Sequence, residues 1–189
     1  RHTRLQGDWS SDVCSSDLWS SYCGQKEVGS EKEGLMARRP YTGMSDGVAK
    51  GKRAGTEAFV KHCVLLSKRN LWNNGTWGVR SIKGKPEKMS VHSTGRAMDL
   101  SWRGKDRKTA NDFINFLADN AAALGIELII DYFPAPHGRA YKCTRDAWEK
   151  YEIHTVTGAP RGDWFHIELS PEFADDPKKV HQAFKALFK

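Results

Sequence analysis

The sequence has few cysteines and lacks any long hydrophobic run. Its four cysteines, Cys14, Cys23, Cys63 and Cys143, form no C-x-x-C pair, so neither a dense disulfide scaffold nor a thiolate zinc finger is indicated. No uninterrupted apolar stretch approaches the ~20 residues that a transmembrane helix needs, and we therefore expect no membrane span. A metal site in this chain would have to use histidines and carboxylates.

The composition suits one globular domain with a basic surface. Apolar residues make up 39% of the 189 positions and aromatic residues 11%, which is enough to build a core. The 30 Lys and Arg against 23 Asp and Glu give a net charge of +7, which favours nucleic acid, an anionic membrane surface or a bacterial wall as partner. Because no helix-turn-helix or zinc-finger spacing appears, we expect no nucleic-acid partner.

The N-terminal part of the sequence differs in character from the rest. Residues 1–18 lack the basic stretch and apolar stretch of a secretory signal, and residues 8–18 resemble a translated sequencing-library adapter. We expect residues 1–35 to be an artefact of sequence assembly or a disordered tail. A single domain then spans residues 36–189, and its Gly-rich, basic stretch 36–55 is expected to be a loop-rich lead-in, either solvated or bound to an anionic wall.

The pattern of apolar residues, caps and breakers predicts the secondary structure. We expect helices over residues 56–69, 109–124 and from Pro177 onward, with Thr56 and Asp176 as N-caps. We expect strands at residues 76–82, 97–102, 127–132, 151–156 and 164–169. We also expect a polar turn at residues 83–88 and one helical turn at residues 144–148. Helices and strands do not alternate regularly, so we expect an α+β fold with a mainly antiparallel sheet.

One short segment combines an imidazole, a glycine and a carboxylate just before an apolar strand. His92, Gly95 and Asp99 stand at offsets 0, 3 and 7. Gly95 permits a tight turn, so the two side chains can converge, and Ala97 leaves room beside them. Zinc accepts such nitrogen and oxygen donors, and a catalytic zinc site uses three protein ligands with one position left to water. We therefore expect a zinc site that lacks only its third ligand.

A second segment near the C-terminus offers that third ligand. His166 and Glu168 fall on one face of a predicted strand, and we expect His166 to complete the site. Asp163 precedes it by three residues, where its carboxylate would act as general base on a metal-bound water or, alternatively, cap a turn after Gly162. Glu168 either orients the imidazole of His166 or faces solvent.

Together these residues resemble the motifs of a family of zinc peptidases that cut peptidoglycan stem peptides. The family includes D-alanyl-D-alanine carboxypeptidases and dipeptidases, peptidoglycan L,D-endopeptidases and peptidase-type phage endolysins. The fixed places of its first signature, S-x-H-x-x-G-x-A-x-D, are filled by Ser90, His92, Gly95, Ala97 and Asp99. Its second signature, an acidic residue three before a histidine, is met by Asp163 and His166, although Phe165 stands where Trp is usual.

The resemblance covers about residues 56–169 and carries several implications. It implies a small antiparallel sheet with helices packed on one side and Zn²⁺ in an open cleft, held by His92, Asp99 and His166. Gly78-Val79-Arg80-Ser81 is similar to a family element, which implies that Arg80 binds the substrate's carbonyl or carboxylate. Asp163 would then be the residue that transfers protons.

We therefore expect a monomeric zinc metallopeptidase that hydrolyses an amide bond in the peptidoglycan stem peptide. Because no export signal is visible, we expect a phage endolysin that stays in the host cytoplasm until lysis and acts on the cell wall. One alternative is a D-Ala-D-Ala carboxypeptidase or dipeptidase with the same metal chemistry. Another is a zinc-stabilised wall-binding module without catalysis, against which the presence of Asp163 argues.

Overall fold

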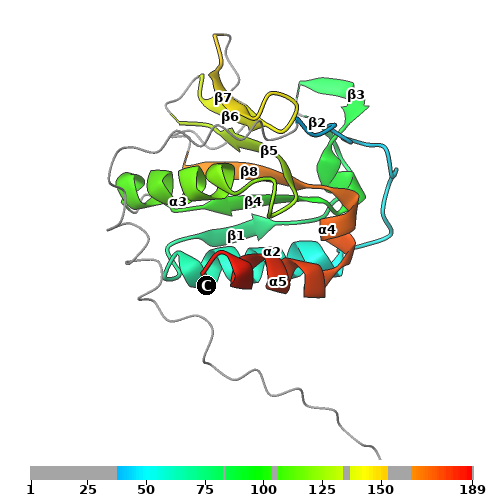
Figure 1. The fold of residues 1–189 in the computed structure, drawn as a ribbon. Helices are drawn as coiled ribbons and strands as arrows, with labels where there is room; N and C mark the ends of the chain where they lie inside the picture. The colour runs from blue at the N-terminus through cyan, green and yellow to red at the C-terminus, as the bar shows by residue number, and fades with distance from the viewer. Residues whose placement is uncertain (1–37, 83, 104–105, 134–136, 153–162, 189) are drawn as a thin grey trace, which may run out of the picture.

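The computed structural model describes residues 38–82, 84–103, 106–133, 137–152 and 163–188 (Figure 1). The expected artefact or tail at residues 1–35 lies outside the described residues. So do Gly162 and most of the strand expected at residues 151–156. No described helix has the length and hydropathy needed to cross a membrane.

A six-stranded antiparallel sheet forms the centre of the molecule. Its strand order is β1-β4-β8-β5-β6-β7, and β8 lies between β4 and β5 (Figure 1). In that order the strands are Trp72–Gly75, Ala97–Ser101, Trp164–Leu169, Ile126–Asp131, Arg139–Lys142 and Ala147–Lys150. A separate hairpin pairs β2 (Ser81–Ile82) with β3 (Lys85–Met89).

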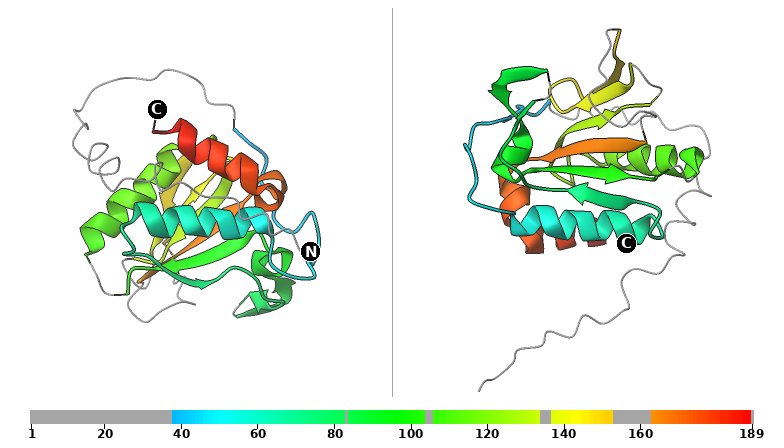
Figure 2. Two further views of the ribbon diagram at one scale, coloured as in Figure 1. Left: turned by 90° about the horizontal axis from the view of Figure 1, so that it is seen from below. Right: turned by 180° about the vertical axis from the view of Figure 1, so that it is seen from behind.

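Four α-helices and one short 3-10 helix accompany the strands in the described part of the chain. They are α2 (Ala54–Leu66), α3 (Arg107–Asp119), α4 (Pro171–Asp175), α5 (Pro177–Ala186) and η2 (Val91–Thr94). Helices α2 and α5 lie side by side (Figure 2). Between them, Phe59 packs against Phe184 with ring centroids 5.0 Å apart. As expected, the side chain of Asp176 caps α5, which begins at Pro177.

The side chains of β8 alternate between the core and the opposite face of the sheet. Phe165, Ile167 and Leu169 join the buried core that the helices also build. Trp164, His166 and Glu168 point to the other face, where they line a cleft. The expected α+β fold with an antiparallel sheet and helices packed on one side is confirmed.

The region between α2 and β4 differs from the prediction. No strand spans residues 76–80; β1 ends before them, and residues 85–89 form β3 where a polar turn was expected. Pro86 is compatible with β3 because this exposed strand belongs to a two-stranded hairpin, where a residue without an N–H can face away from the ladder. Similarly, the helical turn expected at 144–148 is a turn followed by β7, and Asp146 at φ 51° reverses the chain there.

Helix α2 begins earlier than expected, because its N-cap is Arg53 rather than Thr56. The buried hydroxyl of Thr56 instead donates a hydrogen bond of 2.8 Å to the carbonyl of Gly95. That bond connects α2 to the turn between η2 and β4. The helix therefore supports the segment that carries His92.

The lead-in residues 38–53 form turns and bends that pack on the sheet. Ala49 N–H donates to the carbonyl of Ser93 at 2.8 Å, and Thr42 N–H donates to the carboxylate of Glu127 at 3.1 Å. The guanidinium of Arg96 is fully buried and contacts the carbonyl of Gly43 and the carboxylate of Asp46. These contacts bring the lead-in to the cleft, which Tyr41, Gly43 and Met44 help to line.

Candidate metal centre

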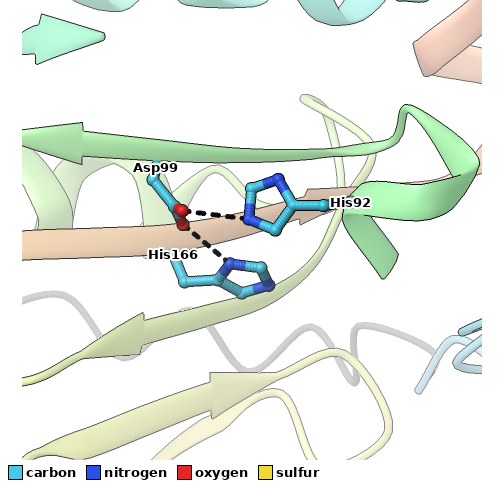
Figure 3. A group of neighbouring side chains, drawn as sticks. All are labelled: His92, Asp99 and His166. Carbon is cyan, nitrogen blue, oxygen red and sulfur yellow. Dashed lines mark hydrogen bonds and ion pairs between the residues drawn. The ribbon is translucent and has the colours of Figure 1, made fainter. Parts of the chain in front are cut away.

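Three of the predicted site residues meet at one point. His92 comes from η2, Asp99 from β4 and His166 from β8, and each offers a ligand atom within 4.8 Å of the others (Figure 3). Asp99 and His166 are direct partners in the antiparallel register of β4 and β8, although 67 residues separate them. All three side chains are buried, and the group could hold a metal ion.

Local structure explains how His92 reaches the group. The side chain of Ser90 accepts a hydrogen bond from His92 N–H at 3.4 Å and so caps η2. Gly95 ends η2 in the left-handed conformation, φ 74°, and directs the chain into β4. A Cβ atom at Gly95 would lie 3.0 Å from Cγ of Arg53 and 3.1 Å from the carbonyl oxygen of Gly51. The conformation and the close packing both favour glycine.

The carboxylate of Asp99 faces both imidazoles with different oxygens. Oδ1 lies 3.0 Å from His166 Nδ1, and Oδ2 lies 3.1 Å from His92 Nε2 (Figure 3). The latter pair is close but not aligned as a hydrogen bond, so buried His92 Nε2 has no hydrogen-bond partner among the described residues. A buried polar atom without a partner is costly in free energy, and an imidazole nitrogen gains a partner when it binds a metal ion as a ligand. The residues present therefore fit a metal ion.

The environment sets the protonation of these groups. Burial acts to raise the pKa of Asp99, but the hydrogen bond with His166 and the close contacts of both imidazoles outweigh it and hold the pKa below its usual value. Burial lowers the pKa of His92. Burial also acts to lower the pKa of His166, but Asp99 and Glu168 raise it to about 10. Ionised Asp99 and neutral His92 are the forms that bind metal, and a cation would replace the proton on His166.

The far nitrogen of His166 is held by a carboxylate. His166 Nε2 lies 2.9 Å from Oε1 of Glu168, whose side chain is buried, so Glu168 does not face solvent. Of its two expected roles, the geometry supports orientation of the imidazole. The hydroxyl of Tyr41 donates to Oε2 of Glu168 at 2.7 Å. Sequence reasoning missed Tyr41, because no spacing or motif connects it with His166.

Arg80 lies at the edge of the group. Its Nη2 is 3.3 Å from Oδ2 of Asp99, and 56% of its side chain is exposed towards solvent. Its main-chain N–H donates to Oγ of Ser93 at 3.1 Å, which ties the segment before β2 to η2. The guanidinium is thus placed beside the candidate metal ligands and remains accessible from the cleft.

Asp163 lies immediately before β8. Its carbonyl accepts hydrogen bonds from Oγ of Ser101 at 2.7 Å and from Trp102 N–H at 3.3 Å. No described contact joins its carboxylate to His92, Asp99 or His166, and Asp163 is not among the residues that line the cleft. The structure therefore brings together the three expected ligands and Arg80, but not the carboxylate of Asp163.

The cleft beside the three ligands has a volume of about 730 Å³. This size lies within the range of about 300–1,000 Å³ that is common for ligand sites. One wall comes from the segment around β2 and β3 and carries Arg80, Ile82 and Lys88. The other wall includes Tyr132 and Trp164, whose rings stack with centroids 4.4 Å apart. The cleft therefore combines a cationic side with an aromatic side.

Comparison with known proteins adds no relative. A scan against protein-family models and searches of curated sequences and of solved structures found no match to this chain. The geometry of the site and the motifs that it contains therefore remain the indications of function.

Proposed function

We propose that this protein is a zinc-dependent peptidase that hydrolyses an amide bond in the peptidoglycan stem peptide. The observation that carries the proposal is the convergence of His92, Asp99 and His166 beside an open-sided cleft. The motifs that contain these residues resemble those of peptidoglycan-cleaving zinc peptidases. As a phage endolysin the protein would act on the bacterial cell wall.

The donor set supports zinc as the metal. Two imidazole nitrogens and one carboxylate oxygen are ligands that zinc accepts, and three protein ligands are typical of catalytic rather than structural zinc sites. The free cysteines Cys63 and Cys143 are buried elsewhere and take no part in the group. When bound, zinc supplies a Lewis acid for the scissile carbonyl and lowers the pKa of a water molecule to about 7.

The protein's own residues divide the remaining tasks. Arg80 offers a permanently charged fork of donors to a carbonyl or carboxylate of the substrate. Asp163 takes a proton from the attacking water and returns one to the leaving amine. For this task its carboxylate must turn towards the cleft, and catalytic hydrogen bonds of ligand-free enzymes often form only once the substrate is bound.

The test compares three full-length proteins on purified peptidoglycan: wild type, Asp163→Asn and the control Asp112→Asn. Asp112 lies on α3 and pairs with Lys108, away from the cleft. We expect about one zinc per chain in all three, and turnover of Asp163→Asn lower by about 10²–10⁴-fold. Loss of zinc from Asp163→Asn would make this residue a ligand, and unchanged turnover would reject it as the base.

The products of the same assay distinguish the proposed endopeptidase from two other functions. The cationic wall formed by Arg80 and Lys88 also suits a D-Ala-D-Ala carboxypeptidase, whose substrate ends in a free carboxylate. Release of free D-alanine from muropeptides would favour that activity, whereas new internal amino termini would favour an endopeptidase. A wild-type protein that binds zinc and the wall without any cleavage would be a binding module.

A further inference from the structure

We propose that Tyr41 is a positioning residue for the metal centre, acting on His166 through Glu168. By this inference the lead-in residues 38–53 help to determine how tightly the metal ion is held. The inference rests on the proposed metal site, because an oriented imidazole matters only if His166 is a ligand. Tyr41 is not assigned a catalytic role.

The proposal follows from a continuous series of short contacts. The hydroxyl of Tyr41 donates to Oε2 of Glu168 at 2.7 Å, and Oε1 of the same carboxylate lies 2.9 Å from His166 Nε2. The other ring nitrogen, Nδ1, lies 3.0 Å from Asp99. Glu168 therefore engages one nitrogen of His166 and leaves Nδ1 facing the other ligands. A carboxylate behind a ligand imidazole selects the tautomer and ring orientation, and raises the basicity of the ligand.

The carboxylate in the middle of this series is deeply buried. Glu168 is only 4% exposed, and a buried charge is stable only when its oxygens are paired. His166 uses one oxygen and Tyr41 the other. Removal of the Tyr41 hydroxyl leaves Oε2 without that donor, which frees Glu168 to shift and loosens its hold on His166.

The position of Tyr41 is set by contacts that do not involve Glu168. The next residue, Thr42, hydrogen-bonds Glu127 through its main-chain N–H at 3.1 Å, and Gly43 accepts from the buried guanidinium of Arg96. The ring of Tyr41 itself lies under the ammonium of Lys142, 4.3 Å from the ring centroid. These contacts remain when only the hydroxyl is removed. The phenol is thus held in place in advance, and little conformational freedom is lost when it donates to Glu168.

The chain contains a closely matched control. The hydroxyl of Tyr141 donates to Oδ1 of Asp146 at 2.6 Å in the turn between β6 and β7. Neither residue lines the cleft or belongs to the candidate ligand group. Tyr141→Phe therefore removes the same hydroxyl, from the same type of bond to a carboxylate, without touching the metal centre.

The experiment measures zinc affinity and stability separately in full-length wild type, Tyr41→Phe and Tyr141→Phe. The dissociation constant for Zn²⁺ comes from competition with a chromophoric chelator, and the melting temperature is taken on each metal-free protein. We expect Tyr41→Phe to raise the zinc dissociation constant about tenfold, within the range known for groups that orient metal ligands. We expect no change of zinc affinity in Tyr141→Phe.

The possible outcomes separate a failure of the positioning role of Tyr41 from a failure of the proposed zinc site. If wild type binds zinc and Tyr41→Phe binds it equally well, the positioning role is overturned. If Tyr41→Phe only lowers the melting temperature of the metal-free protein, as Tyr141→Phe does, the hydroxyl is merely structural. If wild type itself binds no zinc, the proposed function fails first, and this inference falls with it.

Discussion

Gly95 shows how a single backbone position supports the candidate metal centre. It follows η2 at φ 74°, and a Cβ atom there would lie only 3.0 Å from Cγ of Arg53 and 3.1 Å from the carbonyl oxygen of Gly51. The same residue accepts the hydrogen bond of Thr56 from α2. A change at Gly95 would therefore disturb the turn that carries His92 towards Asp99.

We predict that Gly95→Ala destabilises the protein by about 2–3 kcal/mol, because it combines an unfavourable left-handed alanine with overpacking. Gly47 is the control: it also has a positive φ, 71°, but no atom lies within 4 Å of the position of its Cβ. Gly47→Ala should cost only about 1 kcal/mol and leave zinc affinity unchanged. Urea unfolding of the metal-free proteins measures the difference. Equal costs for the two variants would show that the contact with Arg53 and Gly51 is unimportant.

At the scale of elements, the β2–β3 hairpin supplies a cationic wall without taking part in the main sheet. Lys88 lines the cleft, whereas Lys85 lies on the same exposed strand and does not. We predict that Lys88→Ala raises KM for a stem peptide with a free carboxylate by up to about fivefold, since an exposed ion pair contributes up to about 1 kcal/mol. Lys85→Ala should leave KM unchanged. If both variants raise KM equally, the lysines act through the overall positive charge and not through contact with the substrate. In that case KM of the wild type should rise with salt concentration.

Helices α2 and α5 meet through a pair of histidines. His62 Nε2 lies 2.7 Å from His181 Nδ1, and the ring of His62 stacks on Phe184 with centroids 4.5 Å apart. Burial, and then the charge of His181, lowers the pKa of His62 to about 4. The unfolded chain, with a pKa of about 6.5, therefore takes up a proton between pH 6.5 and 4 that folded His62 does not bind.

We predict that this contact makes the protein less stable as the pH falls through that window. The free energy of unfolding falls by about 1–2 kcal/mol after allowance for the partial exposure of His62, and this decrease levels off below about pH 4. His62→Leu should lose correspondingly less stability between pH 7 and pH 4.5. Urea unfolding at both pH values, with chelator present so that metal release does not contribute, measures the difference. The same pH dependence in both proteins would refute the assignment to His62.

For the whole molecule, the sequence predicted those features that depend on local pattern. The spacing of His92, Gly95 and Asp99 indicated a ligand pair on either side of a turn, and the period of a strand placed His166 and Glu168 on one face. The strands that carry Asp99 and His166 were also predicted, so their convergence required only that β4 and β8 pair. That pairing is what the structure contains.

Other features depend on contacts between distant segments and left no local pattern. The β2–β3 hairpin is closed at its base by a hydrogen bond from Ser90 N–H to the carbonyl of Arg80, and the preceding segment is joined to η2 because Gly78 N–H donates to the carbonyl of His92. Tyr41 reaches Glu168 across 127 positions in the sequence. The burial of Arg96 under the lead-in likewise follows from the tertiary fold. Neither propensity nor spacing encodes such contacts, so the lead-in was expected to be only a loop.

The central claim is that two imidazoles and one carboxylate hold a single zinc ion. Zinc K-edge X-ray absorption of the full-length protein, loaded with one equivalent of Zn²⁺ and then dialysed, tests it most directly. We predict nitrogen and oxygen neighbours at about 2.0–2.2 Å, with the scattering pattern of two imidazole rings, one of which is lost in His166→Ala. Sulfur neighbours at about 2.3 Å, or a wild-type protein that retains no zinc, would contradict the claim.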